Sequence, residues 1–297
     1  MTWQGGRKEV RIKKAKTLVI GLGEIGYNNC EYMSLHGLNV DGYDINDKAV
    51  QHALNVGVIK KKATNFQGYD YYVICVSTHS PKKTSSPSFK SFFDVINKLS
   101  SEGSEGSLII IESTITKGLS NKIKTMLNHR LHVAHAPHRF YANEKTIHGI
   151  NQMRVLGGCE PCCTQEALHF YKDLLGIPMQ TVDDIEIAEL SKVVENAYRM
   201  VQIAFAEELK MFCDSNHIDF NVLRTAINSK WNINILEARD GINGHCLPKD
   251  SQMYITLVKD TVPFSIAYSA KIVDQLYKLK IANKLKKKNF ITQKVIT

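Results

Sequence analysis

A glycine-rich hexapeptide near the N-terminus, Gly21-Leu22-Gly23-Glu24-Ile25-Gly26, constrains the fold more than any other part of the chain. It follows the β-branched and apolar run Thr17–Gly21, which predicts a strand, and it precedes a helical pattern. In this context Gly21 allows a tight turn, Gly23 lets a pyrophosphate approach the backbone, and Gly26 permits close helix–strand packing. The chain is therefore expected to begin as a dinucleotide-binding α/β fold.

An acidic residue after the next expected strand indicates which dinucleotide is bound. Asp44 ends the alternating run Leu38–Tyr43. A carboxylate at this point can accept hydrogen bonds from both ribose hydroxyls and would repel a 2′-phosphate. The expected cofactor is therefore NAD rather than NADP. Its expected contacts in this region are Gly21, Gly23, Glu24, Ile25, Gly26 and Asp44.

Short apolar strands alternate with helical patterns through the first part of the chain. Strands are expected at Tyr71–Val76, Leu108–Glu112, Leu131–Ala134 and Met153–Gly157, and helices at about 23–36, Asp47–Asn55, Ser88–Ser100, Gly118–His129 and Thr164–Leu175. This alternation predicts a parallel sheet with right-handed crossovers. A long helix is expected from Ile185 to about Ser215, followed by shorter helices and a last helix at about Phe264–Lys284. The prediction is α/β: an N-terminal Rossmann domain at 1–184, then an all-helical domain at 185–297.

The composition excludes several classes of protein. Hydrophobic residues make up 43% and charged residues 23% of the chain, as in globular proteins, and no apolar run approaches the roughly 20 residues that span a bilayer. The polar, basic N-terminus does not resemble a signal peptide, and the odd number of cysteines, seven, suits a reducing compartment. We therefore expect a cytoplasmic protein with no membrane partner. The charge of +9, gathered toward both ends, indicates solvated tails or attraction of an anionic substrate, and no motif indicates nucleic-acid binding.

Two further segments carry residues suited to chemistry. Lys192 and Asn196 are four apart on the expected long helix, so they share a face that presents an ammonium and an amide, unless that face is simply solvated. The heptapeptide Gly244-His245-Cys246-Leu247-Pro248-Lys249-Asp250 lies in a loop expected at 240–250. Its cysteine is either a buried small residue or a nucleophile, and the glycines and nearby cationic groups favour the nucleophile.

Taken together, the motifs resemble the UDP-glucose/GDP-mannose dehydrogenase family, the nucleotide-sugar dehydrogenases. They are the glycine loop, Cys75-Val76-Ser77-Thr78, Glu112-Ser113-Thr114, the helix segment from Lys192 to Arg199 and the cysteine heptapeptide. The resemblance covers roughly residues 17–283.

The resemblance implies oxidation of a sugar's primary alcohol to a carboxylate with two NAD, as in polysaccharide biosynthesis. Cys246 would form a thiohemiacetal and then a thioester, with Lys192 and Asn196 stabilising the oxyanion. Asp250 and Thr114 would position water and move protons. Thr78 and Thr114 would also contact NAD, while the long helix would pack at a homodimer interface.

Three departures from the family pattern concern the substrate. The family carries a third domain that holds much of the nucleotide, and this chain stops before it. The family's Pro-Glu-Arg or Pro-Glu-Phe motif is Pro137-His138-Arg139-Phe140 here, and its Gly-Gly is Asn243-Gly244. His138 could replace the glutamate as a base, bind a substrate phosphate together with Arg139, or be a solvated loop residue. His138, Arg139, Phe140, Lys192, Asn196, Asn243 and Gly244 are the expected contacts of an anionic sugar substrate.

No metal site is expected. The four histidines His129, His132, His135 and His138 recur every third residue, and neighbours at that spacing on a strand face opposite sides. The segment Cys159-Glu160-Pro161-Cys162-Cys163 lacks a second cysteine pair and is expected to be a loop.

Two other functions remain open. A β-hydroxyacid dehydrogenase also pairs a Rossmann domain with helices and a Lys-x-x-x-Asn segment, but it needs no cysteine. A non-catalytic NAD-binding subunit would not need Lys192, Asn196, Cys246 or Asp250.

Overall fold

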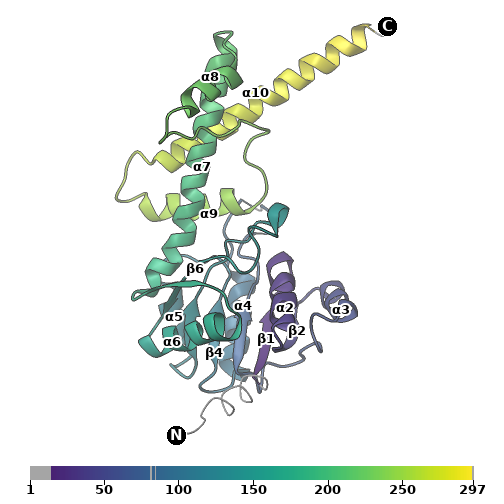
Figure 1. The fold of residues 1–297 in the computed structure, drawn as a ribbon, viewed down its shortest axis with the longest axis vertical. Helices are drawn as coiled ribbons and strands as arrows, with labels where there is room; N and C mark the ends of the chain where they lie inside the picture. The colour runs from purple at the N-terminus through teal and green to yellow at the C-terminus, as the bar shows by residue number, and fades with distance from the viewer. Residues whose placement is uncertain (1–14, 81, 84, 296–297) are drawn as a thin grey trace. The chain divides into compact units, whose positions relative to one another are not determined.

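The structure, a computed structural model, describes residues 15–80, 82–83 and 85–295. The basic run Arg7–Lys14 lies outside the described residues, as do the side chains of the lysine-rich end from residue 285. The chain forms two compact units: one extends to Thr78 and includes Ser88–Lys192, and the other contains His79–Pro87 and the chain from Val193. The boundary predicted at 184/185 falls at the start of helix α7 (Ile185–Ser215), which continues from the first unit into the second (Figure 1). That boundary remains a proposal.

The first unit is built on a seven-stranded sheet in the order β2-β1-β3-β4-β5-β6-β7. The strands are β1 (Lys16–Ile20), β2 (Asn39–Tyr43), β3 (Tyr71–Ile74), β4 (Leu108–Ile111), β5 (His132–His135), β6 (Arg154–Gly158) and β7 (Met179–Val182). The first five run parallel, with Val19 opposite Val73 in the register of β1 and β3. The predicted Rossmann-type α/β fold is confirmed.

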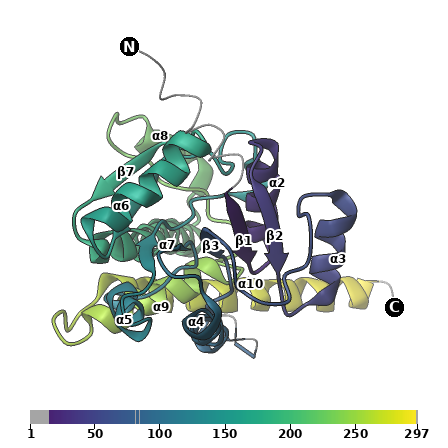
Figure 2. The same cartoon turned by 90° about the horizontal axis from the view of Figure 1, so that it is seen from below.

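Two apolar clusters cover the two faces of this sheet. On one face, Val19 and Val73 belong to a cluster with Met33 of α2 and Phe170. On the other face, Leu18 belongs to a cluster with residues of α4 and α5. Figure 2 shows α4 and α5 on one side of the sheet and α2 and α6 on the other. Because both faces are buried, the central strands are almost continuously apolar rather than alternating.

The expectation of a wholly parallel sheet is wrong at its far edge. β6 pairs with β5 in antiparallel fashion, and β7, which the sequence analysis did not identify, pairs parallel to β6. The segment between β5 and β6 contains no α-helix, and its helical structure is the short 3₁₀ turn Ala142–Glu144. Without a crossover helix, the chain returns in the opposite direction.

The helices of the first unit begin and end close to their predicted positions. They are α2 (Glu24–Leu35), α3 (Asp47–Val56), α4 (Lys90–Glu102), α5 (Leu119–Met126) and α6 (Pro161–Leu168), and a π-helical turn (His169–Leu174) follows α6. α3 begins where Asn46 Oδ1 accepts a hydrogen bond from the Lys48 N–H, and it ends at Gly57 in the left-handed conformation. One prediction is wrong: Cys162 and Cys163 lie in the first turn of α6, after Pro161, and not in a loop.

The second unit contains most of α7 together with α8 (Phe220–Asn228), α9 (Cys246–Val258) and α10 (Ile266–Val295). The last helix is longer than predicted, and the predicted loop 240–250 ends at His245, where α9 is capped. Met200 and Ala204 of α7 pack with Ile242 and Ala270 in a small apolar core. Among the described residues, no helix combines the length and the apolar character that crossing a membrane requires.

Candidate functional site

The glycine loop has the geometry that its spacing predicts. Gly21 has φ +93°, and a Cβ on it would lie 2.8 Å from the Cys75 carbonyl. A Cβ on Gly26 would lie 1.7 Å from the Gly21 carbonyl oxygen, so α2 packs directly on the loop. At Gly23, which caps α2, no atom of the described residues other than its two chain neighbours lies within 4 Å of an added Cβ. Space therefore remains beside the first N–H groups of α2, where a pyrophosphate fits.

Asp44 faces the glycine loop from the end of β2. Its Oδ2 accepts a hydrogen bond from the Leu22 N–H at 2.6 Å, and its Oδ1 accepts one from the Asn46 N–H at 2.8 Å. These bonds hold the carboxylate beside the loop, where a cofactor ribose would meet it. The exposed Glu24 and the half-buried Ile25 complete the predicted cofactor loop in the first turn of α2.

Thr78 and Thr114 lie together beyond the carboxyl ends of neighbouring strands. The buried Thr78 donates a hydrogen bond from its Oγ1 to the Thr114 carbonyl at 2.8 Å. Ser113 Oγ donates to the Val76 carbonyl at 2.7 Å, which joins the loop after β4 to the loop after β3. Open α/β sheets bind ligands at this edge. The structure therefore brings both predicted threonines to the edge where the glycine loop also lies.

A buried polar cluster surrounds Glu112, the first residue after β4. Its carboxylate lies 2.6 Å from His138 Nε2 and accepts hydrogen bonds from Arg154 Nη1 at 2.8 Å and from the Tyr171 hydroxyl at 2.5 Å. Asn29 also donates to it through Nδ2. Although burial opposes the charge, His138 and Arg154 hold the pKa of Glu112 well below its ordinary value. The carboxylate is thus ionised and fully hydrogen-bonded.

His138 is a buried member of this cluster, so its interpretation as a solvated loop residue is wrong. Burial and the Arg154 charge lower its pKa, and the Lys192 charge adds a smaller effect in the same direction. The ring is therefore neutral near pH 7. Within the part of the chain that the structure describes, its Nδ1 has no hydrogen-bond partner, while Nε2 faces Glu112. Lys192 lies within electrostatic reach of a ring nitrogen that can accept a proton.

The two residues after His138 have structural contacts of their own. Arg139 donates from Nη1 to the Met153 carbonyl at 2.9 Å. Phe140 packs, partly buried, against the apolar cluster on one face of the sheet. Their predicted contacts with substrate remain proposals.

In the helical unit, Asp250 contacts Asn196 of α7 and the adjacent Lys249. Asn196 Nδ2 donates to Asp250 Oδ2 at 2.5 Å, and Lys249 Nζ lies 2.7 Å from Asp250 Oδ1. Asp250 and Lys249 are 1% and 5% exposed. The buried Asp250 carboxylate therefore both pairs with the Lys249 ammonium and orients the amide of Asn196.

Cys246 is the first residue of α9, and its thiol is exposed. His245 Nδ1 lies 3.1 Å from the Cys246 sulfur, and the His245 ring stacks on His79 with the centroids 4.8 Å apart. A ring nitrogen at this distance can take the thiol proton and leave a thiolate, which is the nucleophilic form of cysteine.

Helix α10 anchors the segment that leads to Cys246. Asp274 accepts a hydrogen bond from the Ile242 N–H at 2.7 Å, and Lys278 donates to the Ile242 carbonyl. Beyond this anchor, Asn243 and Gly244 are exposed, and Gly244 has φ +77° with open space around an added Cβ. A ligand can therefore approach this backbone closely.

Sequence reasoning missed the supporting residues of the Glu112 cluster. The motif Glu112-Ser113-Thr114 indicated no role for Glu112. No motif in the sequence indicated a role for Asn29, Arg154 or Tyr171. One signal was present: Arg154 begins the apolar strand β6, and a charged residue in a buried strand needs a partner of opposite charge.

The Rossmann sheet, the glycine loop and Asp44 together define a dinucleotide-binding protein. Two domains of one family match the sequence: the NAD binding domain of the UDP-glucose/GDP-mannose dehydrogenase family over residues 52–175, and the central domain of that family over residues 186–275. The chain belongs to the UDP-glucose/GDP-mannose dehydrogenase family. The predicted family and the predicted NAD cofactor are confirmed.

Several curated relatives are UDP-N-acetyl-D-mannosamine dehydrogenases. The protein of Methanococcus maripaludis strain S2 is 29% identical over 257 residues, which cover 79% of this chain and 60% of the relative. That of Methanococcus vannielii is 29% identical over 265 residues, which cover 82% of this chain and 62% of the relative. The chain thus matches somewhat less than two thirds of the length of these relatives.

Solved structures share the fold. A UDP-D-ManNAc dehydrogenase from Pyrococcus horikoshii has a TM-score of 0.81 at 23% identity, covering 92% of this chain and 71% of the other. A 3-hydroxyisobutyrate dehydrogenase from Mycobacterium tuberculosis has a TM-score of 0.68 at 15% identity, covering 90% of this chain and 94% of the other. At such identities the likeness concerns the fold alone.

Proposed function

We propose that this protein oxidises the primary alcohol of an anionic sugar to a carboxylate through a covalent adduct on Cys246. The observation that carries this proposal is the exposed Cys246 thiol with the His245 ring 3.1 Å away, at the start of the helix that buries the Lys249–Asp250 pair. When bound, NAD supplies the hydride acceptor for each of two oxidations. The glycine loop and Asp44 would hold it.

The Cys246 thiol would hold the substrate covalently during the second oxidation, and hydrolysis would release the product afterwards. The alcohol first loses a hydride and a proton to give an aldehyde, and the Cys246 thiolate adds to its carbonyl carbon to give a thiohemiacetal. Loss of a second hydride from the carbon of this adduct, together with the proton of its hydroxyl, leaves a thioester. Water then attacks the thioester carbon, the C–S bond breaks, and the carboxylate leaves while the thiol is restored.

Lys192 and Asn196 would stabilise the oxyanion. They lie one turn apart on α7, so the ammonium and the amide can point to the same side. Asp250 accepts one N–H of the Asn196 amide, which orients the second N–H for substrate. Asp250 and Thr114 would guide water and protons, as the family resemblance implies.

His138 is better suited to accept a proton than to bind a phosphate. The Glu112 carboxylate lies 2.6 Å from its Nε2, where it would repel a phosphate but would orient a neutral ring. Burial lowers the pKa of His138, which keeps Nδ1 available as a base. We therefore propose that His138, held by Glu112, activates the water that cleaves the thioester.

The proposed substrate is a nucleotide sugar, with UDP-N-acetylmannosamine as the first candidate because the relatives above are named for it. A diphosphate also suits the net charge of +9. A sugar phosphate is the alternative substrate.

Counting NADH tests the function. The purified protein is offered UDP-N-acetylmannosamine, UDP-glucose, hexose phosphates and 3-hydroxyacids. The proposal predicts two NADH per molecule of a sugar substrate. One NADH per 3-hydroxyacid would instead identify a β-hydroxyacid dehydrogenase, which the fold likeness to 3-hydroxyisobutyrate dehydrogenase keeps as the second candidate. No NADH on any compound would favour a non-catalytic subunit.

Two variants separate the covalent step from hydrolysis. Cys246→Ser should stop carboxylate formation, because a hydroxyl is a weak nucleophile at its ordinary pKa. His138→Gln should let the thioester accumulate, visible as added mass on the peptide that contains Cys246, and His138→Glu should restore its turnover. Carboxylate production by Cys246→Ser at the wild-type rate would rule out the adduct, and rapid turnover by His138→Gln would exclude the histidine as the base.

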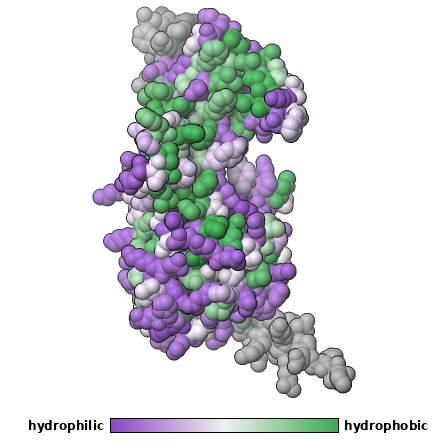
Figure 3. Space-filling view, turned by 90° about the vertical axis from the view of Figure 1, so that its left-hand side faces the viewer, coloured by the Kyte–Doolittle hydropathy of each residue, from purple (hydrophilic) through white to green (hydrophobic). Residues whose placement is uncertain are grey.

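We also propose a cytoplasmic homodimer. The exposed apolar side chains Val194, Tyr198, Phe205 and Phe212 recur along α7 at spacings of four and seven, so they form one stripe on that helix. Apolar side chains also gather over the helical unit in the upper half of Figure 3. The cytoplasmic location rests on the odd number of cysteines.

A further inference from the structure

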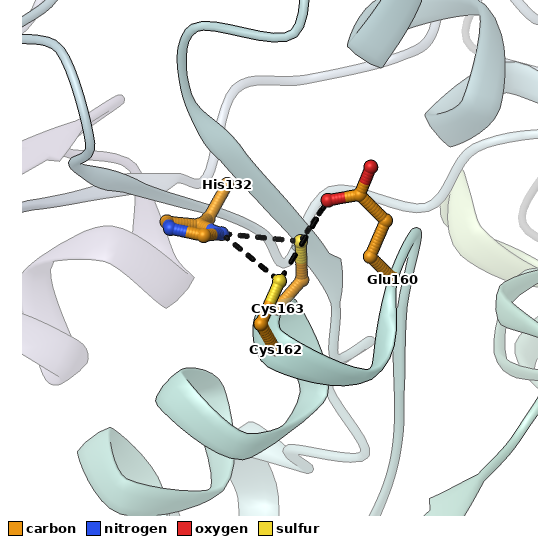
Figure 4. A group of neighbouring side chains, drawn as sticks. All are labelled: His132, Glu160, Cys162 and Cys163. Atoms are coloured by element: carbon orange, nitrogen blue, oxygen red, sulfur yellow. Dashed lines mark hydrogen bonds between the residues drawn. The ribbon is translucent and has the colours of Figure 1, made fainter.

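Two segments of the sequence lie side by side in the first unit, and neither of them contains a complete site by itself. His132 begins β5, and Glu160, Cys162 and Cys163 lie at the start of α6. Their side chains converge, with one ligand atom of each within 4.8 Å of those of the others (Figure 4). None of these residues has a part in the proposed sugar oxidation.

The backbone brings the two segments together. The Cys159 N–H donates to the Val133 carbonyl at 3.0 Å, which ties the segment before α6 to β5. The Glu160 carbonyl accepts hydrogen bonds from the Cys163 N–H at 2.9 Å and from the Thr164 N–H at 3.1 Å. These bonds fix the first turn of α6 beside the start of β5.

Four of the six distances between the ligand atoms are close to the edges of a coordination tetrahedron. With zinc–sulfur bonds of about 2.3 Å and zinc–nitrogen or zinc–oxygen bonds of about 2.0–2.1 Å, a tetrahedral angle separates a sulfur ligand from a nitrogen or oxygen ligand by about 3.5–3.6 Å. His132 Nδ1 lies 3.7 Å from the Cys162 sulfur and 3.4 Å from the Cys163 sulfur. Glu160 Oε2 lies 3.7 Å and 3.9 Å from the same two sulfurs. Successive helical residues do not normally face one ligand, yet both thiols do so here.

Charge and access also suit a cation. Two thiolates and one carboxylate carry three negative charges, which a divalent ion and the Lys124 ammonium would balance. Lys124 is buried, and its Nζ lies 3.2 Å from Glu160 Oε2. Cys162 and Glu160 are exposed, so an ion can enter from solvent, whereas Cys163 is buried and anchors the site.

We propose that His132, Glu160, Cys162 and Cys163 form a tetrahedral site for a thiophilic divalent cation of the zinc class. Thiolate and imidazole ligands select such ions over magnesium or calcium. Four protein ligands leave no open position, so the ion has a structural role: it fastens the start of α6 to β5. Metal binding displaces the thiol protons and stabilises the folded protein.

Cobalt tests the site by spectroscopy. The reduced, metal-free chain is titrated with Co²⁺ alone, and the sulfur-to-cobalt charge-transfer band and the tetrahedral d–d bands are followed. We expect one Co²⁺ per chain, displaced by Zn²⁺, with zinc raising the melting temperature. Cys162→Ser and His132→Gln should each weaken binding by more than about tenfold, since even partners outside a ligand set are worth about 10- to 100-fold.

Cys246→Ser is the matched control, because Cys246 is also exposed and also has a histidine ring nitrogen near its sulfur. It should retain the bands and the affinity. The proposal is overturned if the wild-type chain gives no saturable thiolate–cobalt band, or if Cys246→Ser removes the band while Cys162→Ser keeps it. Far-UV circular dichroism shows whether each variant is folded. If His132→Gln is misfolded, the surface variant Cys162→Ser decides the question.

Discussion

The glycine loop gives the sharpest quantitative prediction, because two of its glycines should respond in opposite ways to one added methyl group. At Gly23 an added Cβ meets no described atom within 4 Å beyond its chain neighbours, and the backbone has φ −67°, which alanine adopts freely. Replacing glycine with alanine at an N-cap costs about 0.5–1 kcal/mol. Alanine also lowers the conformational entropy of the unfolded chain, which stabilises the folded protein by about 0.4–1 kcal/mol. Gly23→Ala should therefore change the stability by less than about 0.5 kcal/mol.

The same methyl group on Gly26 cannot be accommodated. Its Cβ would lie 1.7 Å from the Gly21 carbonyl oxygen, where real Cβ contacts stay beyond 3.0 Å, so α2 must move away from the loop by about 1.3 Å. Forcing such a shift in a packed region costs roughly 3 kcal/mol. For a unit of this size, the melting temperature should fall by about 6–12 °C.

The effect on NAD binding should have the opposite order: among folded molecules, Gly23→Ala should weaken binding more than Gly26→Ala does. The methyl of Gly23→Ala would occupy the space that the pyrophosphate needs, at about 1–3 kcal/mol, which weakens NAD binding by about 5- to 150-fold. Calorimetric titration with NAD gives the dissociation constant, and thermal unfolding gives the stability. The reasoning is refuted if Gly23→Ala binds NAD as tightly as the wild type, or if the two variants lose the same stability.

Three further measurements test other parts of the structure. Asp44 should give NAD a lower dissociation constant than NADP, and Asp44→Asn should bring the two constants closer together. Equal dissociation constants in the wild type would contradict this role of Asp44. Burial lowers the pKa of His135 to about 3, so the unfolded chain takes up a proton near pH 6.5 that the folded protein does not. The free energy of unfolding should therefore fall by about 2 kcal/mol between pH 7 and pH 5 because of this histidine. Urea unfolding at the two pH values measures the fall, and it should be smaller by that amount in His135→Leu. Light scattering at micromolar concentration should give a dimeric mass, and Phe205→Glu should give a monomeric one; a monomeric wild type would exclude the α7 interface.

Local sequence patterns predicted the elements that carry function. The β-branched run, the three glycines and the acid after the next strand belong to one stretch of chain, and the role of each follows from its own residue type and position. The same holds for Lys192 and Asn196, whose spacing of four puts them on one side of any helix. The family motifs were recognisable for this reason, and those after residue 52 lie within the two matched domains.

The direction of β6 could not be predicted in this way. A strand's apolar pattern is the same whether it runs parallel or antiparallel to its neighbour, and the direction depends on the path of the connection before it. Here that connection has no α-helix, and β6 returns antiparallel to β5.

Tertiary structure alone decided which polar groups meet. Glu112 and His138 come from loops after different strands, and their contact and burial exclude only one of the three interpretations of His138, that of a solvated loop residue. His132 and Cys163 are 31 residues apart, and neither of their sequence clusters contains a full ligand set. Periodicity reports the face of its own element and nothing of the element packed against it. The chemistry of a single residue was thus determined by the sequence, whereas its partners followed from how the strands and helices pack.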